Sequence, residues 1–131
     1  MVSMGTLFAY GTLQHPRIIT HVLGRVPESR PVLLPGFARY RVDGYRFPGI
    51  VPDPRAETDG TLFLNIRTDE WQRLDEYEAD YYERWTVETV SPEGVTCRAQ
   101  AYVVPPHHQH ALTTDSWDLK TYKPGPDSGI T

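Results

Sequence analysis

Proline and glycine interrupt this chain so often that long helices have little room to form. Twelve prolines and ten glycines are spread over 131 residues, and both residue types favour turns and weaken helix interiors. The segments between them are short and apolar, and the chain also carries eight tyrosines, which are typical of strands. We therefore expect a β-rich α+β fold with many short strands and a few brief helices.

Length and charge exclude several classes of protein. A chain of 131 residues suits one domain, because domains commonly have roughly 100 to 150 residues. We expect a single domain over residues 1–131, with a core at about 6–122 and a polar C-terminal tail. The formal net charge of −4, without a run of lysine or arginine, argues against nucleic acid as a partner. No stretch approaches the roughly 18 apolar residues of a membrane helix, so no membrane partner is expected.

Cysteine usage favours a cytoplasmic setting. Cys97 is the only cysteine and has no partner for an internal disulfide, and the first residues lack the segments of a secretory signal. Val95, Cys97 and Ala99 are two positions apart and therefore share one face of a predicted strand. This position indicates a small buried apolar role rather than catalysis.

Apolar periodicity and turn signals predict the order of the elements. An apolar run at 6–10 ends abruptly and predicts a first strand, and Pro16 suits the first position of a short helix that Gly24 ends. Thr68 is the expected cap of a second helix that runs to about Glu78. The other expected elements are strands at 32–34, 36–42, 45–50, 60–66, 85–90 and 95–104, a loop at 51–59 and a hairpin connection at 91–94.

The second predicted helix places one carboxyl on its apolar face. With about 3.6 residues per turn, Glu78 falls on the same stripe as Trp71 and Leu74, and this stripe is expected to pack on the sheet. Asp75 and Glu76 point elsewhere and are easily solvated. Burial raises the pKa of a carboxyl, which suits a general acid/base near neutral pH. The spacing alone also fits a Glu78 that lies in water at a frayed helix end or pairs with an arginine.

A turn connects the first strand to the first helix. Gly11 allows a ligand to approach the backbone closely, and a strand that leads through it to a proline-initiated helix can aim consecutive N–H groups at one point. Such an arrangement suits a carboxylate. The same residues also fit a simple connecting turn without a ligand.

Two motifs together resemble the gamma-glutamylcyclotransferase family, including its AIG2-like and gamma-glutamylamine cyclotransferase members. They are Tyr10-Gly11-Thr12-Leu13 after the apolar strand and Leu74-Asp75-Glu76-Tyr77-Glu78 at the end of the helix. The similarity covers roughly residues 6 to 122, and the two motifs are specific as a pair. Supporting matches are Phe47-Pro48-Gly49-Ile50, Gly60-Thr61-Leu62-Phe63, Tyr82-Glu83-Arg84, Ala101-Tyr102-Val103 and, more loosely, Ser116-Trp117.

The resemblance implies a small mixed β-barrel with short flanking helices and a cavity for a gamma-glutamyl group. It implies an enzyme of the lyase or acyltransferase type, in which backbone amides hold the substrate's α-carboxylate and Glu78 is the general acid/base. The α-amine then attacks the side-chain carbonyl, which yields 5-oxoproline and a free amine without a metal or organic cofactor. Two tyrosines are included as pocket candidates, although each also fits a packed core position. The implied substrate-binding residues are Tyr10, Gly11, Thr12, Leu13 and Tyr82.

Other features point to no further chemistry. The histidines of Pro106-His107-His108-Gln109-His110 lack a nearby acidic or cysteine partner, and we expect them to be solvated rather than to bind a metal. Ser91, His15 and His21 form no recognisable nucleophile arrangement. A non-catalytic module that binds a small carboxylate is the alternative function, and hydrolysis to free glutamate in the same cavity is a third. The leaving amine and the oligomeric state stay open.

Overall fold

The computed structural model describes residues 5–41, 48–78 and 82–105. Its elements in chain order are β1 (Gly5–Ala9), the 3-10 helix η1 (Thr12–Gln14), α1 (Pro16–Leu23), β2 (Ser29–Arg41), β3 (Pro48–Ile66), α2 (Thr68–Glu78), β4 (Glu83–Val90) and β5 (Thr96–Val103). The predictions about the C-terminal tail, Ser116-Trp117 and the histidine segment from Pro106 lie outside the described residues.

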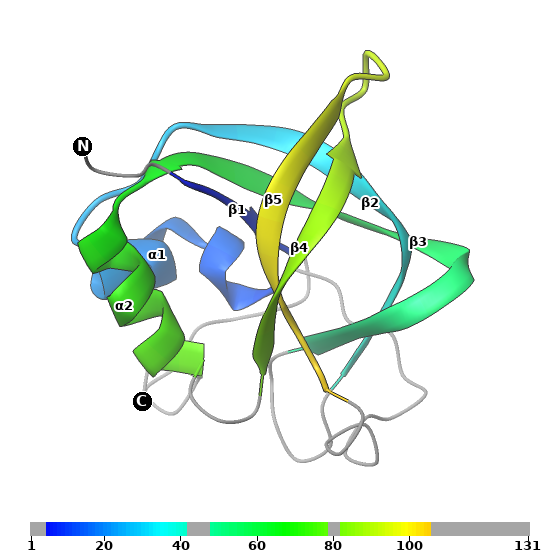
Figure 1. Cartoon of the computed structure of the whole chain (residues 1–131). Helices are drawn as coiled ribbons and strands as arrows, with labels where there is room; N and C mark the ends of the chain where they lie inside the picture. Colours follow the sequence, from blue (N-terminus) through cyan, green and yellow to red (C-terminus); the bar gives the residue numbers. More distant parts are fainter. Residues whose placement is uncertain (1–4, 42–47, 79–81, 106–131) are drawn as a thin grey trace.

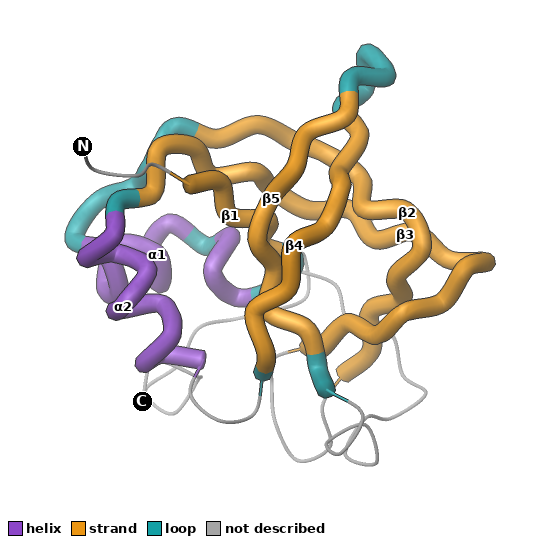
Figure 2. The backbone as a smooth tube through the Cα atoms, viewed as in Figure 1, coloured by secondary structure: helices purple, strands orange, loops and turns teal. Residues whose placement is uncertain are grey.

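The five strands form a closed barrel in the order β1-β3-β2-β4-β5. Neighbouring strands pair antiparallel, except that β1 and β5 pair in parallel, at Leu7 and Gln100, and so close the barrel. Figure 1 shows α1 and α2 together on one side of the barrel, and Figure 2 shows the strands wrapping around its axis. The predicted small mixed barrel with short flanking helices is therefore confirmed.

Alternation along the strands creates two apolar layers. On β1, Phe8 belongs to the layer inside the barrel, whereas Leu7 and Ala9 belong to the layer between the barrel wall and the helices. The second layer receives Ile18 from α1 and Leu74 from α2, and both side chains are fully buried. Each such side chain stabilises the fold by about 1.5–3 kcal/mol. The early strand thus has one face in each layer.

The loop expected at 51–59 is wrong, because these residues belong to the long strand β3. β3 pairs with β2 on both sides of a register shift, from Leu34 opposite Thr58 to Phe37 opposite Pro52. The shift leaves room for a local turn, in which the Asp53 carboxylate accepts a hydrogen bond from the Arg55 amide at 3.0 Å. Polar residues and proline fit here because this part of the strand faces solvent on one side.

The helices begin and end close to their predicted bounds. α1 begins at Pro16 and ends at Gly24, whose φ of 79° is the left-handed conformation that favours glycine. The expected cap Thr68 is wrong by one position, because the amide of Trp71 donates to the Arg67 carbonyl and makes Arg67 the N-cap. The last predicted strand begins after Val95, which is 64% exposed. Among the described residues, no helix is long and apolar enough to cross a membrane.

One acid of α2 is fully buried, and the sequence does not distinguish it from a solvated one. Glu70 accepts hydrogen bonds from Arg25 Nε and Nη2, both at 2.7 Å, and from the Arg67 amide at 3.0 Å. The Arg25 guanidinium holds the pKa of Glu70 at about 2, well below its usual range. The same guanidinium donates to the Asn65 carbonyl at 3.1 Å. This ion pair therefore fixes the beginning of α2 against the end of β3.

Candidate active site

Glu78 is the last residue of α2 and is half-buried. Leu74 on the same stripe is fully buried, and Trp71 packs against the same apolar layer. Burial raises the pKa of Glu78 to about 8. No hydrogen bond or ion pair joins its carboxyl to another residue in the described part of the chain. A carboxyl in this setting can take up and release a proton near neutral pH.

A polar network lies beside Glu78. The Tyr102 hydroxyl donates to Asp75 Oδ1 at 2.7 Å, and Arg84 Nη1 lies 3.5 Å from the same oxygen. Burial and then this hydrogen bond raise the pKa of the Tyr102 hydroxyl, and the nearby Glu78 adds to the effect. Arg84 also lies 4.8 Å from the centre of the Trp71 ring. Asp75 is exposed, as expected, with 48% of its side chain accessible, and its carboxylate in addition accepts the Tyr102 hydrogen bond.

The early turn presents three consecutive backbone amides. Gly11, Thr12 and Leu13 are all buried. Within the described residues their N–H groups donate to no acceptor, although buried amides are nearly always paired. Their carbonyl oxygens are occupied in part: Gly11 accepts from the Gln14 amide at 3.1 Å, and Thr12 accepts from the His15 amide at 2.9 Å. Among the described residues, the turn is therefore held by its own hydrogen bonds and has three amide donors available to a ligand.

Gly11 is required by a neighbour within the chain. A Cβ at this position would lie 2.7 Å from Cγ and 2.8 Å from Cδ of Pro48, which is closer than side chains tolerate. The Tyr82 hydroxyl donates to the Pro48 carbonyl at 2.6 Å. Pro48 therefore packs on the turn and holds Tyr82 beside it. A larger residue at Gly11 would disturb this packing as well as any ligand.

One side-chain contact joins the turn to the end of α2, and another joins Tyr10 to β5. The Thr12 hydroxyl lies 3.4 Å from the Tyr77 hydroxyl, one residue before Glu78. The Tyr10 hydroxyl donates to the Tyr102 carbonyl at 2.6 Å, and the Tyr10 side chain lies in the layer inside the barrel. These contacts, with the hydrogen bond from Tyr82 to Pro48, connect the early turn to Tyr82 and to the residue before Glu78. Tyr10 contributes to the turn through its backbone, and its ring is part of the core.

The chain was compared with known proteins. Residues 7–119 match the family model described as gamma-glutamyl cyclotransferase, AIG2-like. This chain belongs to that family. AIG2-like protein A of Arabidopsis thaliana is 38% identical over 93 residues, which are 71% of this chain and 56% of that protein. The chain spans about half the length of the curated relatives it matches.

Solved structures share the fold. The solution structure of an Arabidopsis thaliana protein is similar to this chain, with a TM-score of 0.72 and 29% sequence identity. The match covers 94% of this chain and 77% of the Arabidopsis protein. A structure named gamma-glutamyl cyclotransferase has a TM-score of 0.73 at 15% identity and covers 95% of both chains. At that identity the second likeness concerns the fold alone. The family and its structural neighbours therefore include gamma-glutamyl cyclotransferases.

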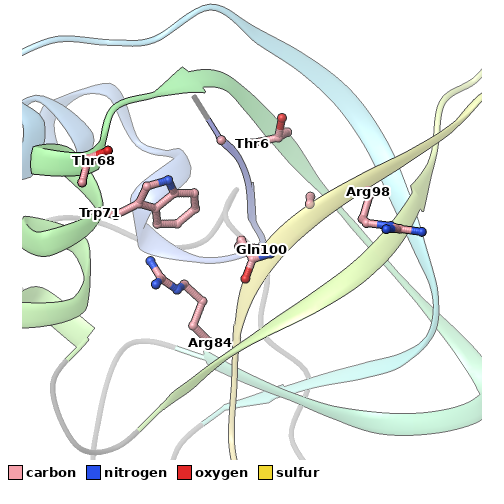
Figure 3. Close-up of a pocket in the computed structure, with 8 residues that line it drawn as sticks. Thr6, Thr68, Trp71, Arg84, Arg98 and Gln100 are labelled. Atoms are coloured by element: carbon pink, nitrogen blue, oxygen red, sulfur yellow. The ribbon is translucent and has the colours of Figure 1, made fainter. Parts of the chain in front are cut away.

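A separate hollow of about 600 Å³ lies outside the barrel, where β1, α2, β4 and β5 meet. Figure 3 shows Arg84 reaching toward Trp71 there, whereas Arg98 extends away from them. None of the predicted site residues lines this hollow. Arg84 connects it to the Tyr102 network through Asp75. In the described residues, no three metal-ligating side chains cluster here or elsewhere.

Proposed function

We propose that this protein is a cyclotransferase that acts on a gamma-glutamyl amine or amide. The observation that carries the proposal is the contact of the early turn with the end of α2, through the hydroxyls of Thr12 and Tyr77. Among the described residues, the pKa of the Glu78 carboxyl is raised to about 8, and the amides of Gly11, Thr12 and Leu13 donate to no acceptor. The membership in a family that includes gamma-glutamyl cyclotransferases supports the same reading.

The free amides suit the α-carboxylate of the substrate. A buried N–H without an acceptor costs about 1–3 kcal/mol, so three in a row favour a bound anion. A carboxylate accepts such hydrogen bonds strongly because it is charged. The contact between the Thr12 and Tyr77 hydroxyls supports a carboxylate site close to the end of α2. The substrate's α-ammonium, one bond from its carboxylate, can then lie near Glu78.

Glu78 carries the proton in the proposed reaction. Its raised pKa leaves the carboxyl partly protonated near neutral pH, and an arriving α-ammonium favours the ionised form. The carboxylate accepts one proton from the ammonium, and the freed amine attacks the side-chain carbonyl carbon. The new C–N bond closes a five-membered ring, and the original C–N bond to the leaving amine breaks. Glu78 returns its proton to the leaving nitrogen, and the second proton of the new ring nitrogen then passes through the same carboxylate to the released amine, which departs as an ammonium ion.

The reaction needs little beyond orientation and proton transfer. Nucleophile and electrophile belong to one molecule, so holding the folded-back conformer can lower the barrier by several kcal/mol. A positioned acid/base adds a factor of roughly 10² to 10⁴. The proposal uses no metal and no organic cofactor, and it retains the cytoplasmic setting expected for a chain with one cysteine.

Product analysis tests the proposal. The protein is incubated with a panel of gamma-glutamyl compounds, namely gamma-glutamyl amino acids, a gamma-glutamyl lysine isopeptide and simple gamma-glutamyl amides, and the products are separated by chromatography. We expect 5-oxoproline and free amine from at least one compound, with loss of activity in Glu78→Gln and retention in the exposed control Glu76→Gln. Free glutamate in place of 5-oxoproline would indicate hydrolysis. Binding without any product would indicate the non-catalytic module.

A further inference from the structure

Arg39 on β2 contacts the turn from the barrel wall. Its side chain is 14% exposed. Nη1 donates to the Tyr10 carbonyl at 2.8 Å and to the Asp59 carbonyl at 2.9 Å, and Nη2 donates to Asp59 Oδ1 at 2.7 Å. One planar guanidinium therefore joins the end of β1 to β3. Neither of the two sequence motifs includes this residue.

The contact with the Tyr10 carbonyl controls the direction of the Gly11 amide. The peptide unit between Tyr10 and Gly11 is planar and trans, so its C=O and N–H bonds point in opposite directions. When Arg39 holds the carbonyl, the N–H is fixed toward the other side of the chain. A hydrogen bond from a cation to the carbonyl also polarises the peptide and strengthens its N–H as a donor.

The other two amides of the turn are held in the same way, from within the turn itself. The Gly11 carbonyl accepts from the Gln14 amide and from Gln14 Nε2 at 3.3 Å, which fixes the N–H of Thr12. The Thr12 carbonyl accepts from the His15 amide, which fixes the N–H of Leu13. Unlike these bonds within the turn, the Arg39 hydrogen bond comes from β2, which is part of the barrel. Arg39 therefore sets the orientation of the whole turn relative to the barrel.

We propose that Arg39 is a positioning residue that aims the Gly11 amide at the carboxylate of the bound substrate. This inference rests on the proposed function, because that function supplies the carboxylate. Arg39 does not touch the substrate and acts only through the Tyr10–Gly11 peptide unit. Its loss weakens the recognition of one substrate group, and the proton transfer at Glu78 continues.

A pair of substrates separates positioning from a purely structural role. The first is a gamma-glutamyl amide that the wild type converts, and the second is the matching 4-aminobutanoyl amide, which lacks the α-carboxylate and cyclises to 2-pyrrolidinone. We expect Arg39→Lys to raise KM for the first substrate at least about tenfold, in line with the sensitivity of bound geometry to small displacements, with a smaller change in kcat. The second substrate should react at the wild-type rate. Arg30→Lys is the matched control, because Arg30 lies on the same strand, is exposed and contacts Glu28.

Equal losses on both substrates would overturn the inference in favour of a structural role, and unchanged kinetics would also overturn it. If Arg39→Lys does not fold, Arg39→Gln is used, which keeps a donor for the Tyr10 carbonyl without the charge. A wild type that makes no 5-oxoproline defeats the proposed function, and amide resonances then decide the inference about Arg39. Addition of 5-oxoproline should shift the resonances of Gly11, Thr12 and Leu13 in the wild type and leave them unmoved in Arg39→Lys. Absent or equal shifts would reject it.

Discussion

Replacing Glu78 by glutamine is expected to stabilise the fold while it removes the proposed acid/base. In the folded protein burial raises the pKa of Glu78 to about 8, whereas an unfolded chain leaves a glutamate near about 4.3. Between these values the folded state holds a proton that the unfolded state releases. The stability of the wild type should therefore fall as pH rises through this window and level off above about pH 8. Glutamine is neutral at every pH, so the variant does not lose stability by ionising a buried group.

The size of the effect follows from the width of the window. Each pH unit changes the free energy of unfolding by about 1.4 kcal/mol per proton, so about four units set an upper limit of about 5 kcal/mol. Glu78 is half-buried, and water screens part of its carboxyl. We therefore expect Glu78→Gln to be more stable than the wild type by about 1–3 kcal/mol near pH 8.5.

Urea unfolding of three proteins at about pH 5 and about pH 8.5 measures this difference. The gap between Glu78→Gln and the wild type should be largest at the higher pH and shrink at the lower one. Glu76→Gln, which changes an exposed acid on the same helix, should follow the wild type at both. Equal stability of Glu78→Gln and the wild type near pH 8.5 would refute the reasoning, because it would mean that the carboxyl is not desolvated.

Three further predictions follow from the structure. The rate constant kcat/KM should rise with pH through about 8, where the Glu78 carboxyl of the free protein is half ionised, and level off about one pH unit higher. A flat profile between about pH 6 and pH 9 would contradict this. Because Arg25 holds the pKa of Glu70 near 2, their interaction stabilises the fold above about pH 4.3, and urea unfolding should show a loss of about 2–3 kcal/mol as pH falls toward 2. Glu70→Gln should remove this dependence on acid, and a variant that keeps it would contradict the prediction. Gly11→Ala brings a Cβ to within 2.8 Å of the Pro48 ring and should cost about 1–3 kcal/mol in thermal unfolding; an unaltered Tm would show that the ring can move.

Helical periodicity was sufficient to place Glu78 on the inward stripe of α2, because a run of three turns repeats its apolar positions regularly. The turn at Gly11 was also visible as a break between a strand and a proline-initiated helix. The sequence could not show which amides stay free, since this depends on hydrogen bonds that Gln14 and Arg39 make to the turn. Arg39 occurs in an alternating strand that looks like any other.

The errors have a common physical origin in long-range pairing. The segment 51–59 carries proline and aspartate, which signal a turn locally, but β2 pairs with both ends of it, at 51–52 and at 57–59, and so makes it part of a long strand. The burial of Glu70, a first-turn acid of α2, likewise depends on Arg25, which is 45 residues away in the sequence, together with the nearby Arg67 amide.

The parallel pairing of β1 with β5 makes the candidate site a late product of folding. Tyr10 and Tyr102 are 92 positions apart, and contacts with such large sequence separation form slowly. Until residues 96–103 dock, β1 and β4 each keep an open edge that can recruit strands from other molecules. A fragment that ends before residue 96 should therefore aggregate instead of folding into a smaller barrel, and the turn at Gly11 should become ordered only when the last strand is in place.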